Sequence, residues 1–161
     1  MHNAFNEIFE YVKGLTIVDS HEHLPHREDA REKDNDVIME YLAHYFNRDL
    51  ISAGLSTEDF QRIMDPDMPI MEKWDIVEPF WNYSRYTGYG RALDISAKAL
   101  YNIDMISRET IEELNDSFKK SLEPGHFKRV LKDMAKIEIS LLDANLECDP
   151  YFFRSVYRLD D

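Results

Sequence analysis

The sequence predicts an α/β fold that is mostly helical, with two parallel strands separated by a long helical insertion. Three observations support this prediction. A short β-branched run ends in two histidines near the N-terminus, apolar residues recur at helical spacing through most of the chain, and a second run alternates apolar and polar residues near the C-terminus. Strands joined by a helical crossover run parallel in one sheet, so the two strands should be neighbours.

The N-terminal elements are a helix and the first strand. The apolar residues between positions 4 and 13 follow helical spacing, and Gly14 can end that helix. The first strand should span about residues 15–20. Residues 25–35 are dominated by charge, which predicts a loop.

A helical insertion should fill about residues 24–136. Asp36 is placed to cap its first helix, and Ser56 offers a capping-box-like start for a short helix after Gly54. Thr87-Gly88-Tyr89-Gly90 predicts a turn. The helices are indicated by apolar residues at helical spacing, which are Val37, Ile38, Tyr41, Leu42 and Tyr45; Ile70, Trp74, Val77 and Trp81; Leu93, Ala97, Leu100 and Tyr101; Ile111, Leu114, Phe118 and Leu122; and Phe127, Val130, Leu131 and Met134.

The second strand should span about residues 137–142. The segment Ile137-Glu138-Ile139-Ser140-Leu141-Leu142 alternates apolar and polar residues as a strand does. No stretch rich in proline, glycine or serine interrupts the chain as a linker would. Residues 1–161 should therefore belong to a single domain.

The composition narrows the classes of partner. The formal net charge of −13 argues against nucleic acid and against an anionic membrane surface, because both need a basic surface. The single Cys148 excludes an intramolecular disulfide. No apolar run approaches the ~20 residues of a membrane span, and the first residues lack the pattern of a signal peptide. We therefore expect a cytoplasmic protein that acts on a small molecule.

The chemistry is concentrated in His21 and His23, at the end of the first strand. Successive side chains on a strand point to opposite faces, so these two imidazoles project from the same face and can converge on one metal ion. If a third ligand exists nearby, His26 and Glu22 are the first candidates.

The segment Ile17-Val18-Asp19-Ser20-His21-Glu22-His23-Leu24-Pro25 resembles the start of the amidohydrolase superfamily, whose members are metal-dependent hydrolases and their relatives with a (β/α)8 barrel, the TIM-barrel fold. In that superfamily the His-x-His pair supplies the first two ligands of a divalent metal ion, most often zinc. The resemblance therefore implies that His21 and His23 are metal ligands.

A second segment is similar to the uronate isomerases within that superfamily. His44-Tyr45-Phe46-Asn47-Arg48 follows the family's His-Tyr-Lys-Trp-Arg pattern, with Phe46 and Asn47 in place of Lys and Trp, and Ile51 where a second arginine is expected. The resemblance implies that Tyr45 and Arg48 bind substrate. A guanidinium group suits a carboxylate, so the substrate could be acidic.

The length of the chain limits how much of a TIM barrel it can contain. A TIM barrel needs about 250 residues, and this chain has 161. The resemblance therefore covers the N-terminal portion of a barrel, that is, a partial domain. The family's remaining metal ligands and its catalytic aspartate lie on later strands and have no matching positions here, so the catalytic residue stays unassigned and the chain alone should be inactive.

Several functions remain open at this stage. Hydrolysis of a small substrate through a metal-activated water is the first expectation. Uronate-isomerase-like isomerisation of a sugar acid and non-oxidative decarboxylation share the same opening motif. The chain could also be a non-catalytic helical fragment, or a homo-oligomer that completes a metal site between copies.

Overall fold

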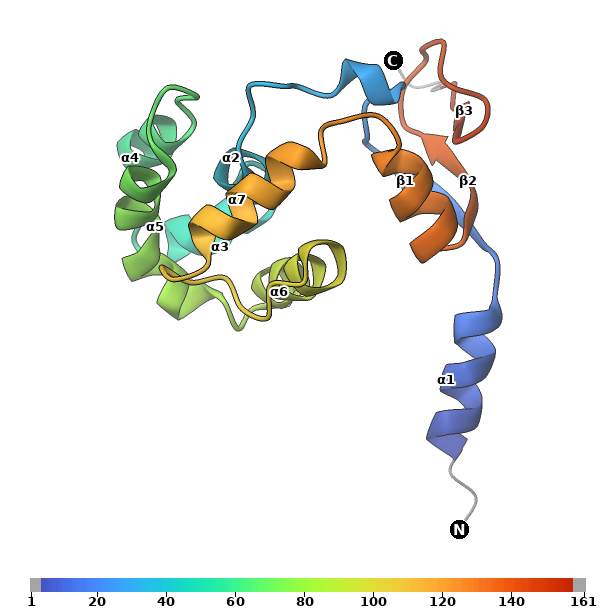
Figure 1. The fold of residues 1–161 in the computed structure, drawn as a ribbon, viewed down its shortest axis with the longest axis horizontal. Coiled ribbons are helices and arrows are strands. Elements are labelled where there is room, and N and C mark those ends of the chain that lie inside the picture. Colours follow the sequence, from blue (N-terminus) through green and yellow to red (C-terminus); the bar gives the residue numbers. More distant parts are fainter. Residues whose placement is uncertain (1–3, 158–161) are drawn as a thin grey trace. The chain divides into compact units, whose positions relative to one another are not determined.

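The protein is described here by a computed structural model that covers residues 4–157. The chain separates into two compact units. The sheet unit comprises Met1–Arg31 and Pro124–Asp161, and the helical unit comprises Glu32–Glu123. Figure 1 shows the elements of both units in chain order. Most of the predicted helical insertion thus folds as a compact unit of its own.

The three strands found within residues 4–157 all belong to the sheet unit. Its elements in order are α1 (Ala4–Gly14), β1 (Ile17–Glu22), the 3₁₀ turn η1 (Glu28–Ala30), the π-helical segment η2 (Lys128–Met134), β2 (Ile137–Leu142) and β3 (Phe153–Ser155). The helix before β1 and the bounds of β2 agree with the sequence prediction. The first strand lies two residues later than expected, so that His21 belongs to the strand itself.

The sheet has the order β1-β2-β3, and both neighbouring pairs are parallel. This confirms that β1 and β2 are adjacent parallel strands. The prediction of two strands was wrong, because β3 adds a third. A strand of three residues, entered from the turn that contains Pro150, is too short to show the alternation by which a strand is recognised in sequence.

The pairing of β1 with β2 is irregular near the histidines. Asp19 pairs with Ser140 and Glu22 pairs with Leu142, so β1 uses three residue steps where β2 uses two. Such a bulge re-aims the side chains beside it and is frequent next to functional sites. Here it lies between Asp19 and Glu22, at the segment that contains His21.

The core of the sheet unit is small. Its buried cluster consists of Phe127, Leu131, Leu142, Phe152 and Phe153. The Glu28 carboxylate accepts hydrogen bonds from the backbone N–H groups of Gly125 at 2.9 Å and Phe127 at 2.6 Å, which ties the two chain segments of the unit together before η2 begins.

The helical unit consists of six α-helices, which are α2 (Val37–Leu42), α3 (Phe46–Ser52), α4 (Thr57–Ile63), α5 (Ile70–Ser84), α6 (Gly88–Tyr101) and α7 (Ile111–Lys120). Asp36 caps α2 and Ser56 caps α4, as the sequence predicted. The prediction of a turn at Thr87–Gly90 was wrong. Thr87 is the N-cap of α6, and its hydroxyl accepts a hydrogen bond from the Gly90 N–H. The same Ser, Thr and Gly residues favour turns and helix starts alike.

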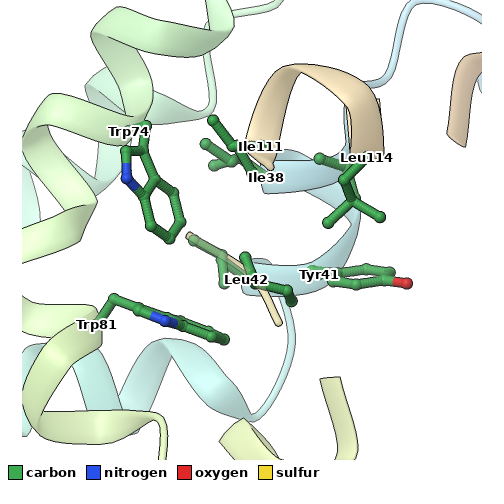
Figure 2. A pocket seen from close by; sticks show the side chains of 9 residues that line it. Ile38, Tyr41, Leu42, Trp74, Trp81, Ile111 and Leu114 are labelled. Carbon is green, nitrogen blue, oxygen red and sulfur yellow. The ribbon is translucent and has the colours of Figure 1, made fainter. Parts of the chain in front are cut away.

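Sixteen buried apolar residues form the core of the helical unit, with Trp74 and Trp81 among the largest. The buried Lys73 ammonium group contacts the Asp36 carboxylate at 2.5 Å. Both tryptophans and Tyr41 line a cavity in this core (Figure 2). Its volume of about 10 Å³ is the space of a single water molecule, so the cavity is too small for a substrate. Burial raises the pKa of Tyr41.

None of the helices within residues 4–157 combines the length and the apolar character that crossing a bilayer requires.

Candidate metal centre

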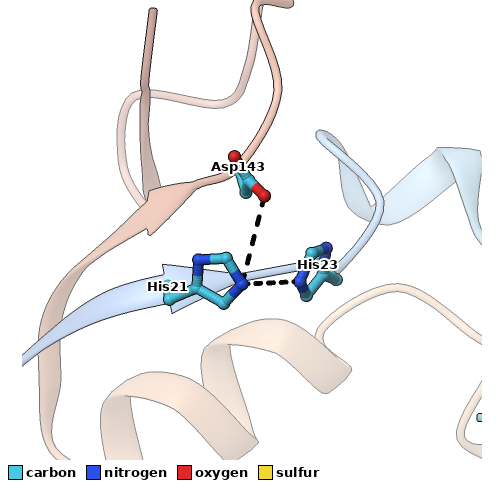
Figure 3. Close-up of side chains that lie close together, drawn as sticks. All are labelled: His21, His23 and Asp143. Atoms are coloured by element: carbon cyan, nitrogen blue, oxygen red, sulfur yellow. Dashed lines mark hydrogen bonds and ion pairs between the residues drawn. The ribbon is translucent and has the colours of Figure 1, made fainter. Parts of the chain in front are cut away.

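His21, His23 and Asp143 gather at one edge of the sheet, as Figure 3 shows. The Nε2 atoms of the two histidines are 2.8 Å apart. The His21 Nε2 atom lies 4.0 Å from Oδ2 of Asp143. One nitrogen or oxygen atom from each of the three residues lies within 4.8 Å of the other two. Within residues 4–157, these are the His, Cys, Asp and Glu side chains that gather closely enough to hold one metal ion.

Two neighbouring parallel strands position these three side chains. His21 lies within β1, His23 follows its last residue, and Asp143 follows the last residue of β2. The Asp143 N–H donates to the Glu22 carbonyl at 3.0 Å, which continues the pairing of the two strands and fixes Asp143 beside the histidines. In parallel α/β sheets the carboxyl ends of the strands are the usual place for ligands.

The backbone around the histidines is held by acidic side chains. The Asp19 carboxylate accepts from the His21 N–H at 3.2 Å. The Glu22 carboxylate accepts from the N–H groups of His23 at 2.8 Å and Leu24 at 3.2 Å. Burial raises the pKa of Glu22, and the nearby Asp19 carboxyl adds to that rise, whereas the two N–H groups lower it. Through these two hydrogen bonds, the Glu22 side chain fixes the backbone at the end of β1.

The donor set suits a divalent transition metal. Two imidazole nitrogens and one carboxylate match the three protein ligands of many catalytic zinc sites. At zinc–nitrogen distances of about 2.0–2.1 Å, two tetrahedral ligands lie about 3.3 Å apart, so the imidazoles would separate by roughly 0.5 Å on binding. The His21 side chain is 63% exposed and that of Asp143 is 17% exposed, so solvent reaches the site.

The third donor was not anticipated from the sequence. His26 and Glu22 were the first candidates, and the structure brings Asp143 to the histidines instead. The signal was present, because a strand was predicted to end at residue 142 beside the first strand. An acidic residue directly after the end of the neighbouring parallel strand belongs to the same sheet edge as the histidines.

Tyr45 and Arg48 belong to the helical unit, whereas the sheet unit alone supplies the three donors. Tyr45 precedes α3, is 64% exposed, and stacks on Tyr89 with ring centroids 5.6 Å apart. Arg48 is an exposed residue of α3, and its side chain makes no hydrogen bond or ion pair with the described part of the chain. Both side chains are therefore accessible to a ligand.

The comparisons with known proteins identify no relative: no family model matches this chain, no curated protein matches it, and no solved structure matches it. The resemblance to the amidohydrolase superfamily therefore rests on the two sequence segments around His21 and Tyr45.

Proposed function

We propose that this chain carries part of the metal centre of a metal-dependent hydrolase of the amidohydrolase type. The observation that supports the proposal is the convergence of His21, His23 and Asp143 at the carboxyl ends of β1 and β2. On this proposal β1 and β2 are the first two strands of a TIM barrel, and the strands that would carry further ligands and the base follow them. Zinc is the ion that the donor set favours.

On this proposal each residue of the metal site has its own role. His21 and His23 would bind the ion as neutral imidazoles, and Asp143 would contribute a negative charge to the same ion. A divalent ion bound there would polarise a substrate carbonyl and lower the pKa of a water molecule. The hydrogen bonds of Asp19 and Glu22 to the strand backbone would keep the imidazoles in place.

Metal titration of the purified chain tests the site. Calorimetry with Zn²⁺, and the visible absorption of Co²⁺, should show one ion per chain. Binding should be lost in the His21→Ala/His23→Ala double variant. Asp143→Asn should raise the dissociation constant by about 10-fold or more, because a charged interaction contributes about 1.5–3 kcal/mol.

Asp133→Asn is the matched control for Asp143→Asn. Asp133 lies in the same unit, and its exposed carboxylate contacts Lys128 rather than the histidines. This variant should bind metal as the unaltered chain does. Equal affinities of the Asp143→Asn and Asp133→Asn variants would remove Asp143 from the site, and an unaffected double histidine variant would refute the metal centre itself.

The substrate is the second part of the proposal. Because the base and further ligands are assigned to later strands, residues 1–161 alone should show no measurable hydrolysis. In a protein that includes those strands, Arg48→Met should raise KM for an acidic substrate by about 10-fold or more, since it removes a charged hydrogen bond. An unchanged KM would exclude Arg48 from substrate binding.

A further inference from the structure

Two exposed tyrosines of the helical unit stack on each other. The rings of Tyr45, which precedes α3, and Tyr89, in the first turn of α6, have centroids 5.6 Å apart and planes inclined by 14°. The residues are nevertheless 64% and 50% exposed. We call these two rings the tyrosine platform. Stacked rings that remain open to solvent offer a flat apolar surface on which a further planar ring can stack.

Hydrogen bonds between α3 and the segment before α6 hold the two rings together. The Thr87 hydroxyl, at the N-cap of α6, donates to the Asp49 carboxylate at 2.5 Å. The Ser84 hydroxyl, at the end of α5, donates to the Asp49 carbonyl at 3.1 Å. Asp49 lies one helical turn after Tyr45, and Thr87 lies two residues before Tyr89. The platform is therefore preorganised, which lowers the entropic cost of binding a ligand.

Arg48 adds a positive charge beside the platform. It follows Tyr45 by three residues, a spacing that makes two side chains neighbours on a helix surface. Its guanidinium group has no hydrogen-bond or ion-pair partner among the described residues. The other residues three or four positions away are His44, Ile51 and Ser52, and none of them is acidic. In a chain with a formal net charge of −13, such an accessible cation favours an anionic ligand.

An arginine beside a pair of aromatic rings suits one chemical class of ligand. A guanidinium group binds a carboxylate through two parallel hydrogen bonds, and a planar ring stacks on an aromatic surface. A carboxylate attached to an aromatic ring makes both interactions at once. The Asp49 carboxylate is half-buried and accepts from the Thr87 hydroxyl, so it leaves Arg48 free for this ligand.

We propose that Arg48 and the tyrosine platform form a binding site for an aromatic carboxylate. The carboxylate accepts hydrogen bonds from Arg48, and the ring of the ligand stacks on the platform. The sequence resemblance covers Tyr45 and Arg48, and the stacking adds Tyr89 to the site. That this ligand is also the substrate rests on the proposed function, whereas its binding requires no metal ion.

Titration of the whole chain with benzoate tests the site, followed by NMR in the presence of EDTA. The amide signals of α3 and of the first turn of α6 should shift, with a dissociation constant of about 10 mM or lower for so small a ligand. Cyclohexanecarboxylate keeps the charge without the aromatic ring, and should bind about 3-fold more weakly. Benzamide keeps the ring without the charge, and should bind about 10-fold more weakly. Equal binding of benzoate and cyclohexanecarboxylate would refute stacking on the platform.

Variants with matched controls test the residues. Arg48→Met should raise the dissociation constant for benzoate by about 10-fold or more, and Tyr89→Leu by about 3-fold or more. Arg62→Met removes a cation of α4 that pairs with Asp59, and Tyr11→Leu removes an exposed tyrosine of α1. Both controls should bind benzoate as the unaltered chain does. Unchanged tryptophan fluorescence shows that the helical core of each variant is folded.

The metal site serves to separate this inference from the proposed function. The His21→Ala/His23→Ala double variant should bind benzoate as tightly as the unaltered chain does. Weaker binding in that variant would place the ligand at the metal site and refute the inference. No binding of benzoate, or equal affinities of the Arg48→Met and Arg62→Met variants, would also refute it. Benzoate binding in a chain that binds no zinc would refute the proposed metal centre alone.

Discussion

The helical unit and the sheet unit differ in how they use their apolar residues. Sixteen buried apolar residues hold the helical unit together, whereas five do so in the sheet unit. In the sheet unit the large apolar residues of α1 are exposed, and the candidate metal ligands lie at the carboxyl ends of β1 and β2. Hydrophobic burial stabilises a fold roughly in proportion to the apolar area that it removes from water. The difference therefore predicts that apolar burial stabilises the helical unit more than it stabilises the sheet unit.

The largest loss of stability is expected from removing the buried ion pair of the helical unit. Replacing Lys73 by Met leaves the Asp36 carboxylate buried without its partner, which should cost about 3–5 kcal/mol of unfolding free energy. Both tryptophans of the sequence lie in the core of this unit, so urea unfolding followed by tryptophan fluorescence reports on it directly.

Lys98→Met provides the control for that experiment. Lys98 also contacts an aspartate, Asp104, but its side chain is 51% exposed, and exposed pairs contribute about 0–1 kcal/mol. A loss in the Lys73→Met variant no larger than in Lys98→Met would show that the helical unit does not depend on its buried pair, and the contrast between the units would weaken.

The next largest loss of stability is expected at the close approach between the ends of α5 and α6 in the helical unit. A Cβ atom on Gly90 would lie 2.7 Å from the backbone of Arg85, nearer than real Cβ atoms come to such neighbours. Gly90→Ala should therefore cost about 1–3 kcal/mol of unfolding free energy through overpacking between the ends of α5 and α6.

Gly88→Ala is matched to that change, since it adds the same methyl group to the same helix. A Cβ atom there meets no heavy atom within 4 Å. Gly88→Ala should leave the unfolding free energy within about 1 kcal/mol of the unaltered protein, or raise it. Similar losses in both variants would mean that the contact between Gly90 and Arg85 does not limit packing in the helical unit.

Local sequence signals predicted the elements better than they predicted the site. The caps at Asp36 and Ser56 and the alternation of β2 depend on a few adjacent residues, and each appears in the structure. Asp143 becomes a candidate ligand only through strand pairing across more than a hundred residues, which no short pattern records. The third strand was missed because its three residues fall below the length at which periodicity is visible.

The acid sensitivity of the sheet unit is the smallest effect that we expect. Burial lowers the pKa of His126 to about 4, with further contributions from Arg31 and Arg129. The Arg129 guanidinium group lies 3.3 Å from Nδ1 of His126, where it donates to the neutral ring. The unfolded state therefore binds a proton more readily, and the stability that the neutral ring contributes is complete above pH ~6.5 and is lost as the pH falls toward 4.

Hydrogen exchange measured at several pH values, and corrected for the intrinsic rates, tests this expectation without metal present. Amides of η2 should lose protection between pH 6.5 and 4 in the unaltered chain, and should lose less of it in His126→Gln, which cannot be protonated. The helical unit should respond equally in both proteins, because His126 and its two arginines all belong to the sheet unit. Identical pH profiles for η2 in both proteins would show that His126 does not couple the stability of the sheet unit to protonation.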